Sequence, residues 1–166
     1  MKKVLVFGVF DGLHEGHRVF LRQAKKEGDY LIAAVARDET VDLLKGHRPK
    51  KNLEARMKEV EDSGLADEVI VEDEKLGTWE VVGKHNPHVI ALGYDQKDLK
   101  VAILGHIRRY DLETEVRVME GHEPEKYHSS LLNSKIRNQN AKVYERLMMM
   151  TNDQATMTND QQNHKS

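Results

Sequence analysis

The sequence predicts an α/β fold, because short apolar runs alternate along it with segments of helical periodicity. The runs with the length and composition of strands are 4–7, 30–36, 68–71, 88–92 and 115–119. The segments with helical periodicity are 16–27, 52–62, 79–84 and 99–110. Strands that alternate with helices favour a parallel sheet, since a right-handed crossover is the normal link between parallel neighbours. We therefore expect a single Rossmann-like domain, a five-stranded parallel sheet with helices on both faces.

The first half of the chain predicts a strand, a helix and a second strand. Residues 4–7 are all apolar, include two β-branched valines and end at Gly8, as expected of a central strand buried on both faces. From 16 to 27, apolar side chains recur at roughly helical spacing between charged ones, and a Gly-Asp pair ends the pattern. The apolar run 30–36 is the second strand, and the polar residues 37–40 mark where it reaches the surface.

The second half repeats this alternation. In 52–62, Leu53, Met57 and Val60 lie on one face of a helix, and the strand 68–71 follows. The run 88–92 ends at Gly93 and is the most strand-like segment here. The short segment 79–84 and the amphipathic segment 99–110 flank it as helices, and 115–119 closes the sheet.

The C-terminal part changes in composition. A last helix is expected from Tyr127 to about Met149, so the domain should span residues 1–150. Residues 151–166 contain only Ala155 and Met157 as apolar side chains, and we expect a disordered polar tail there.

Charge and composition exclude several classes of partner. The 26 basic and 28 acidic residues give a net charge of -2, so there is no overall field to attract nucleic acid or an anionic membrane. No apolar stretch approaches the roughly 20 residues of a membrane span. The chain has no cysteine, which excludes disulfides and thiolate metal sites and is typical of a reducing compartment. We expect a cytoplasmic protein that does not bind nucleic acid or membranes.

The loop after the first strand, residues 8–17, predicts a phosphate site. In open α/β sheets ligands bind at the carboxyl ends of the strands. The glycines of this loop allow a ligand to approach the backbone, and the following helix presents free N–H groups to an anion. His14 and His17, three residues apart, can both reach one phosphate. The alternative is a pair of solvated or helix-capping histidines.

Other phosphate and metal motifs do not match this loop. It lacks Gly-x-Gly-x-x-Gly and Gly-Lys-Ser/Thr, and its His-Glu-Gly-His is one residue short of the zinc-protease pattern. No acidic cluster suggests a dedicated metal site, so a Mg²⁺ ion would arrive on a nucleoside triphosphate. Asp11 is expected to stabilise the loop through backbone N–H groups.

The loop resembles the nucleotidylyltransferase superfamily, whose signature is His-x-Gly-His after the first strand. The segments 35–41, 44–46, 92–96 and 128–130, with Lys135, resemble the archaeal-type FAD synthetase over roughly residues 2–137. The resemblance implies that ATP and FMN give FAD and pyrophosphate, and it leaves a homodimer open. Many relatives have Thr where this chain has Val9, and the cysteines of the archaeal type are missing.

The resemblance also implies roles for individual residues. His14 and His17 would stabilise the α-phosphate in the transition state, and Lys45 would contact phosphates from a basic stretch. The other residues implied to bind the nucleotide are Gly8, Val9, Phe10, Gly16, Gly93, Asp95, His128, Ser129 and Ser130.

Simpler explanations remain open for several of these residues. Lys45 can belong to a solvated loop, the serines can cap a helix, and Gly93 to Asp95 can be a plain turn. Arg56 is either a counterpart of an arginine in relatives or a surface charge on a helix.

Two other functions also stay open. One is a CTP-dependent cytidylyltransferase acting on glycerol 3-phosphate or a similar phosphorylated alcohol. Such enzymes normally have Arg-Thr-x-Gly-Ile-Ser-Thr-Thr where this chain has 125–130. The other is a nucleotide-binding module without catalysis.

Overall fold

The structure is a computed structural model that describes residues 1–121 of the chain. Its elements, in order, are β1 (Lys3–Gly8), α1 (Glu15–Lys25), β2 (Tyr30–Val35), α2 (Asp38–Lys45), α3 (Leu53–Ser63), β3 (Glu68–Val71), α4 (Glu80–His85), β4 (Val89–Leu92), α5 (Lys97–Tyr110) and β5 (Glu115–Val118). The helix expected from Tyr127 and the polar tail 151–166 lie outside the described residues.

The strands form one parallel sheet in the order β3-β2-β1-β4-β5. The predicted α/β fold and five parallel strands are confirmed, and every strand boundary falls within one residue of its expected place. The chain builds outward from β1 through β2 to β3, and then returns to pair β4 with the other side of β1. The direction in which strands are added to the sheet therefore reverses between β1 and β4. In open α/β sheets, ligands bind at the carboxyl ends of the strands at such a switch point.

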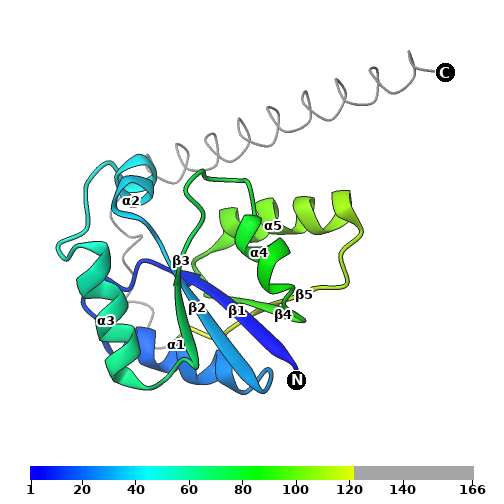
Figure 1. Ribbon diagram of the computed structural model, residues 1–166, viewed down its shortest axis with the longest axis horizontal. Coiled ribbons are helices and arrows are strands. Elements are labelled where there is room, and N and C mark those ends of the chain that lie inside the picture. The colour runs from blue at the N-terminus through cyan, green and yellow to red at the C-terminus, as the bar shows by residue number, and fades with distance from the viewer. Residues whose placement is uncertain (122–166) are drawn as a thin grey trace, which may run out of the picture.

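Apolar layers cover both faces of the sheet. Figure 1 shows α1 and α3 on one side and α4 and α5 on the other. Successive β1 side chains alternate between the layers: Val4 and Val6 pack under α1 and α3, whereas Leu5 and Phe7 pack under α4 and α5. Both layers are well buried, which fixes β1 in the centre and leaves its carboxyl end as a rigid support for the loop that follows.

The helix α2 was not predicted. The sequence suggested only that the chain surfaces after β2, but Asp38–Lys45 forms two turns that lie beyond the carboxyl end of that strand (Figure 1). The sequence features typical of a helix lie at its two ends: acidic residues in the first turn, Lys45 in the last, and Gly46 after it. Gly46 is the C-terminal cap, with a φ of 75°. The apolar pattern is short and includes the exposed Leu43, so periodicity alone does not reveal this helix.

Candidate active site

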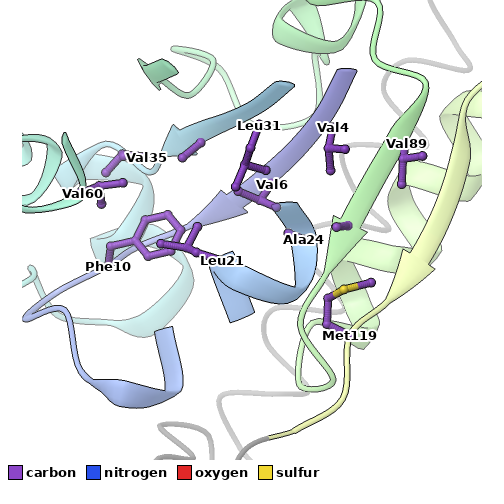
Figure 2. Close-up of a cluster of buried hydrophobic side chains, with 12 residues drawn as sticks. Val4, Val6, Phe10, Leu21, Ala24, Leu31, Val35, Val60, Val89 and Met119 are labelled. Atoms are coloured by element: carbon purple, nitrogen blue, oxygen red, sulfur yellow. The ribbon is translucent and has the colours of Figure 1, made fainter. Parts of the chain in front are cut away.

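The loop between β1 and α1 is shaped by Phe10, whose φ of 52° is unusual for a residue that is not glycine. This turn directs the ring into the core, where it is 1% exposed (Figure 2). A Cβ atom on Gly8 would come within 2.6 Å of that ring. The room that a side chain would need at Gly8 is therefore taken by Phe10, so packing requires a glycine here. The expected contact of the Gly8 main chain with a ligand stays a prediction. Only the main chain of Phe10 remains at the loop.

The two histidines of the loop form a stacked pair. Their ring centroids are 3.8 Å apart with an interplanar angle of 17°. The backbone N–H of His17 donates to Nδ1 of His14 over 3.3 Å, and the N–H of His14 donates to Nδ1 of His17 over 3.4 Å. A nitrogen that accepts a hydrogen bond carries no proton, so in both neutral rings the proton is on Nε2. The loop thus fixes the tautomer of both side chains, and Gly16 lies between them in the first turn of α1.

Burial keeps this pair neutral. It lowers the pKa of His17 from 6.5 to about 4, with smaller contributions in the same direction from His14 and Lys45. It also lowers the pKa of His14. At neutral pH, each ring can offer an Nε2–H donor to an anion without first losing or gaining a proton.

Asp11 connects the loop to the segment that follows α2. Its carboxylate accepts hydrogen bonds from the backbone N–H groups of Lys50, at 2.8 Å, and Lys51, at 3.0 Å. Burial alone would raise the pKa of Asp11, but these two bonds and the charge of Arg56 outweigh it and lower the pKa. The expected role of Asp11 is confirmed, although the N–H groups come from a segment about 40 residues further along the chain.

Arg56 is fully buried, so it is not a surface charge. Its guanidinium donates to the carbonyl of Val9 at 2.8 Å, to the carbonyl of Lys51 at 3.0 Å and to the carboxylate of Asp38 at 2.7 Å. The sequence contained a signal for this. Arg56 lies three residues after Leu53 and four before Val60, on the apolar face of α3, and a charge there must be paired inside the protein.

Lys45 ends α2 and does not lie in a loop. Burial lowers the pKa of its ammonium group, while the carboxylates of Asp95 and Asp11 act in the opposite direction. Its charge also lowers the pKa of His17. Four side chains from three separate segments of the sequence are therefore close enough to influence one another's charge: Asp11 and His17, Lys45, and Asp95.

The segment after β4 is a turn that presents Asp95 on the same edge of the sheet. The N–H of Gln96 donates to the carbonyl of Gly93 at 3.1 Å and closes the turn. A Cβ atom on Gly93 would lie 3.0 Å from Oδ1 of Asp95. A larger residue would therefore crowd the carboxylate, and glycine allows it to stay where it is. The turn expected from the sequence is present, and it stands next to the phosphate loop. The expected binding residues His128, Ser129 and Ser130 lie outside the described residues.

Residues 1–121 contain neither a cluster of metal ligands nor a membrane-spanning helix. No group of three or more His, Asp or Glu side chains in that range is placed to hold a metal ion. Nor is any helix in it long and apolar enough to cross a membrane.

The match to a known protein family covers most of the chain. Residues 5–137 match the family described as cytidylyltransferase-like. A protein named FAD synthase from Thermococcus sibiricus is 38% identical over 114 residues, which cover 69% of this chain and 77% of the relative. A second FAD synthase, from Ferroglobus placidus, is 41% identical over 118 residues, covering 70% of this chain and 74% of the relative.

Solved structures support the same fold. The structure of a lipopolysaccharide core biosynthesis protein from Thermoplasma volcanium superposes with a TM-score of 0.68 at 30% identity, covering 74% of this chain and 99% of that one. A pantoate-beta-alanine ligase from Francisella tularensis, at 16% identity and a TM-score of 0.54, shares the fold; the match covers 87% of this chain and 70% of the ligase.

Proposed function

This chain belongs to the cytidylyltransferase-like family, and we propose that it is an FMN adenylyltransferase, which converts ATP and FMN into FAD and pyrophosphate. In this reaction a phosphate oxygen of FMN attacks the α-phosphorus of ATP. The bond from that phosphorus to the oxygen bridging to the β-phosphate breaks, and pyrophosphate leaves. FMN is the proposed acceptor because two relatives, matched over about three quarters of their own length, are named FAD synthase.

The observation that carries this proposal is the stacked pair of His14 and His17 at the carboxyl end of β1. Negative charge grows on the α-phosphate oxygens as the acceptor attacks. Two fixed Nε2–H donors stabilise that charge without reorganising, and stabilisation of this kind is usually the largest single contribution to catalysis. A protein that only binds nucleotides has no need for donors aimed at a transition state.

The residues around the pair have complementary proposed roles. Lys45 contacts the phosphates from the end of α2, and the main chain of the loop from Gly8 to Phe10 and at Gly16 borders them. The turn from Gly93 to Asp95 binds the nucleoside, with the Asp95 carboxylate as acceptor for hydroxyl or amino groups. His128, Ser129 and Ser130 contact the β- and γ-phosphates, and a Mg²⁺ ion enters with the triphosphate and neutralises part of its charge.

The test is pyrophosphate release by the full chain with ATP or CTP against FMN, glycerol 3-phosphate and nicotinamide mononucleotide. We expect release with ATP and FMN, and a product with the mass of FAD. A parallel preparation of His17→Ala controls for contaminating phosphatases. Release with CTP alone would show a cytidylyltransferase, and no release with any pair would favour a binding module.

A further inference from the structure

The side chain of Gln96 occupies a place in the sheet that a backbone hydrogen bond would otherwise take. Its Oε1 accepts from the N–H of Gly93 over 2.8 Å, and its Nε2 donates to the carbonyl of Phe7 over 2.9 Å. Gly93 follows β4 and Phe7 lies near the end of β1. One amide therefore joins the carboxyl ends of the two central strands.

The register shows which bond is replaced. β1 and β4 pair from Val4 with Val89 to Val6 with Ala91, so the next pair in line is Phe7 with Leu92. The carbonyl of Gly8 accepts from Ala36 in the β2 direction, and the carbonyl of Leu92 accepts from Met119 in the β5 direction.

Backbone groups of successive residues point to opposite sides of a strand. The Phe7 carbonyl therefore faces β4 and the Gly93 N–H faces β1. A direct bond between them would be the next rung of the ladder, and the Gln96 amide is inserted at that rung.

Glutamine is an unusual residue at this position. Gln96 is the residue before α5, where Ser, Thr, Asp or Asn would normally cap the helix, yet its side chain makes no capping bond. Only Asn and Gln carry both a neutral N–H donor and a carbonyl acceptor at the end of the side chain. The partners require one of each, because a buried N–H and a buried carbonyl both need a hydrogen bond.

We propose that Gln96 is a positioning residue that separates the carboxyl ends of β1 and β4 and thereby sets the Gly93–Asp95 turn for the nucleoside of the triphosphate. Without the amide, the Gly93 N–H can bond directly to Phe7 and draw the turn toward β1, or both groups lose their partners. Either change moves Asp95. The phosphate loop is held independently by Asp11 and Arg56, so it is left in place. The inference rests on the proposed function in that the ligand is an adenine nucleotide.

The test separates the two ends of the ligand. The dissociation constants of AMP and of inorganic tripolyphosphate are measured by calorimetry on the full chain and on Gln96→Met, which keeps the length and removes both polar atoms. We expect AMP to bind about tenfold more weakly, as for a loss of one to two hydrogen bonds, and tripolyphosphate to stay within about twofold. Gln96→Leu is also uncharged and also removes both polar atoms, so it should weaken AMP binding in the same way, and it serves if Gln96→Met does not fold. Gln23→Met, on α1, is the matched control.

Equal weakening of both ligands would show a general structural role, and unchanged AMP binding would show no role; either result overturns the inference. The binding assay does not use FMN. If the wild-type protein binds AMP but forms no FAD, the proposed acceptor is wrong while the result for Gln96 still stands. If it binds neither AMP nor ATP, both proposals fail.

Discussion

The buried guanidinium of Arg56 donates to the carbonyl oxygen of Val9 over 2.8 Å, which ties α3 to the main chain of the phosphate loop. Val9 precedes His14 and His17 in that loop, and Asp38, the second partner of Arg56, opens the helix that ends in Lys45. One side chain therefore fixes the segments that carry all three proposed catalytic residues. Arg56 is therefore a positioning residue, which acts through the phosphate loop and α2.

Replacement of Arg56 by lysine tests this arrangement. The guanidinium donates from three separate nitrogen atoms, whereas lysine has all of its N–H groups on one nitrogen that cannot reach all three acceptors, so at least one buried group loses its partner. We expect the free energy of unfolding to fall by about 3 kcal/mol, with a lower kcat for FAD formation. Urea denaturation and steady-state kinetics measure the two effects. Arg22→Lys is the control, because the pair of Arg22 with Glu15 is half exposed and should contribute less than about 1 kcal/mol. Equal, small effects in both variants would contradict the proposed role.

Loss of His17 should affect the reaction far more than the fold. We expect His17→Ala to lower turnover by about 10²- to 10³-fold, as for the removal of one donor to a developing negative charge. The unfolding midpoint measures any structural damage. His85→Ala, at the end of α4, removes a histidine from the opposite edge of the sheet and should leave the rate unchanged. If His17→Ala turns over like the wild type, His17 has no part in the mechanism.

The depressed pKa of His17 predicts a pH dependence of stability. Its pKa falls from 6.5 to about 4 on folding, chiefly through burial. Between these values the folded protein binds fewer protons than the unfolded one, so stability from this residue is complete above pH 6.5 and is lost as the pH falls toward 4. From pH 7.5 to pH 5, His17→Ala should gain about 1 to 2 kcal/mol in unfolding free energy relative to the wild type. A constant difference between the two proteins would mean that His17 titrates normally.

The sequence predicted most of the fold, because the buried strands and the glycines that end them are local signals. It also identified the histidine pair, since a short loop contains both the residues and their geometry. The missing parts depend on contacts between distant segments. Arg56 meets Val9 across 47 positions, and Gln96 meets Phe7 across 89. No local sequence pattern predicts which distant carbonyl group a buried side chain will hydrogen-bond.

The helix α2 was missed for a related reason. Its eight residues have a weak apolar pattern, and its place depends on the bond from Arg56 to Asp38 in its first turn. The sequence alone places Lys45 in a basic stretch, whereas the structure holds it at a helix end beside the histidines. Arg56 offered a usable signal in its position on an apolar helix face.

Lys45 can be distinguished from its basic neighbours by two measurements. Lys45→Met should reduce kcat/KM for ATP by about 10²-fold, because a partly buried charge near the phosphates is lost. Since the charge of Lys45 lowers the pKa of His17, its removal should also raise that pKa, which NMR titration can follow. Lys50→Met removes an exposed charge from the adjoining loop and should change neither quantity. Similar losses of activity in both variants would support a solvated basic loop that attracts the nucleotide only by its overall charge.

Glu72, directly after β3, predicts a pH dependence of opposite sign. Burial raises its pKa from 4.5 to about 7; Asp73 adds to this and Arg37 opposes it. Between these values the folded protein binds more protons than the unfolded one, so the contribution of Glu72 is complete below pH 4.5 and is lost as the pH rises through 7. Glutamine cannot ionise, so the unfolding free energy of Glu72→Gln should rise relative to that of the wild type by about 2 to 3 kcal/mol between pH 5 and pH 8.

Urea denaturation at these two pH values measures the gain, with Glu74→Gln, an exposed carboxylate two residues on, as the control. His17 and Glu72 act in opposite directions over an overlapping range, so the wild-type curve should be flatter between pH 5 and 6.5 than that of either variant. In the doubly substituted protein both slopes disappear together. A wild-type curve steeper than both single variants would contradict the assignment of opposite signs.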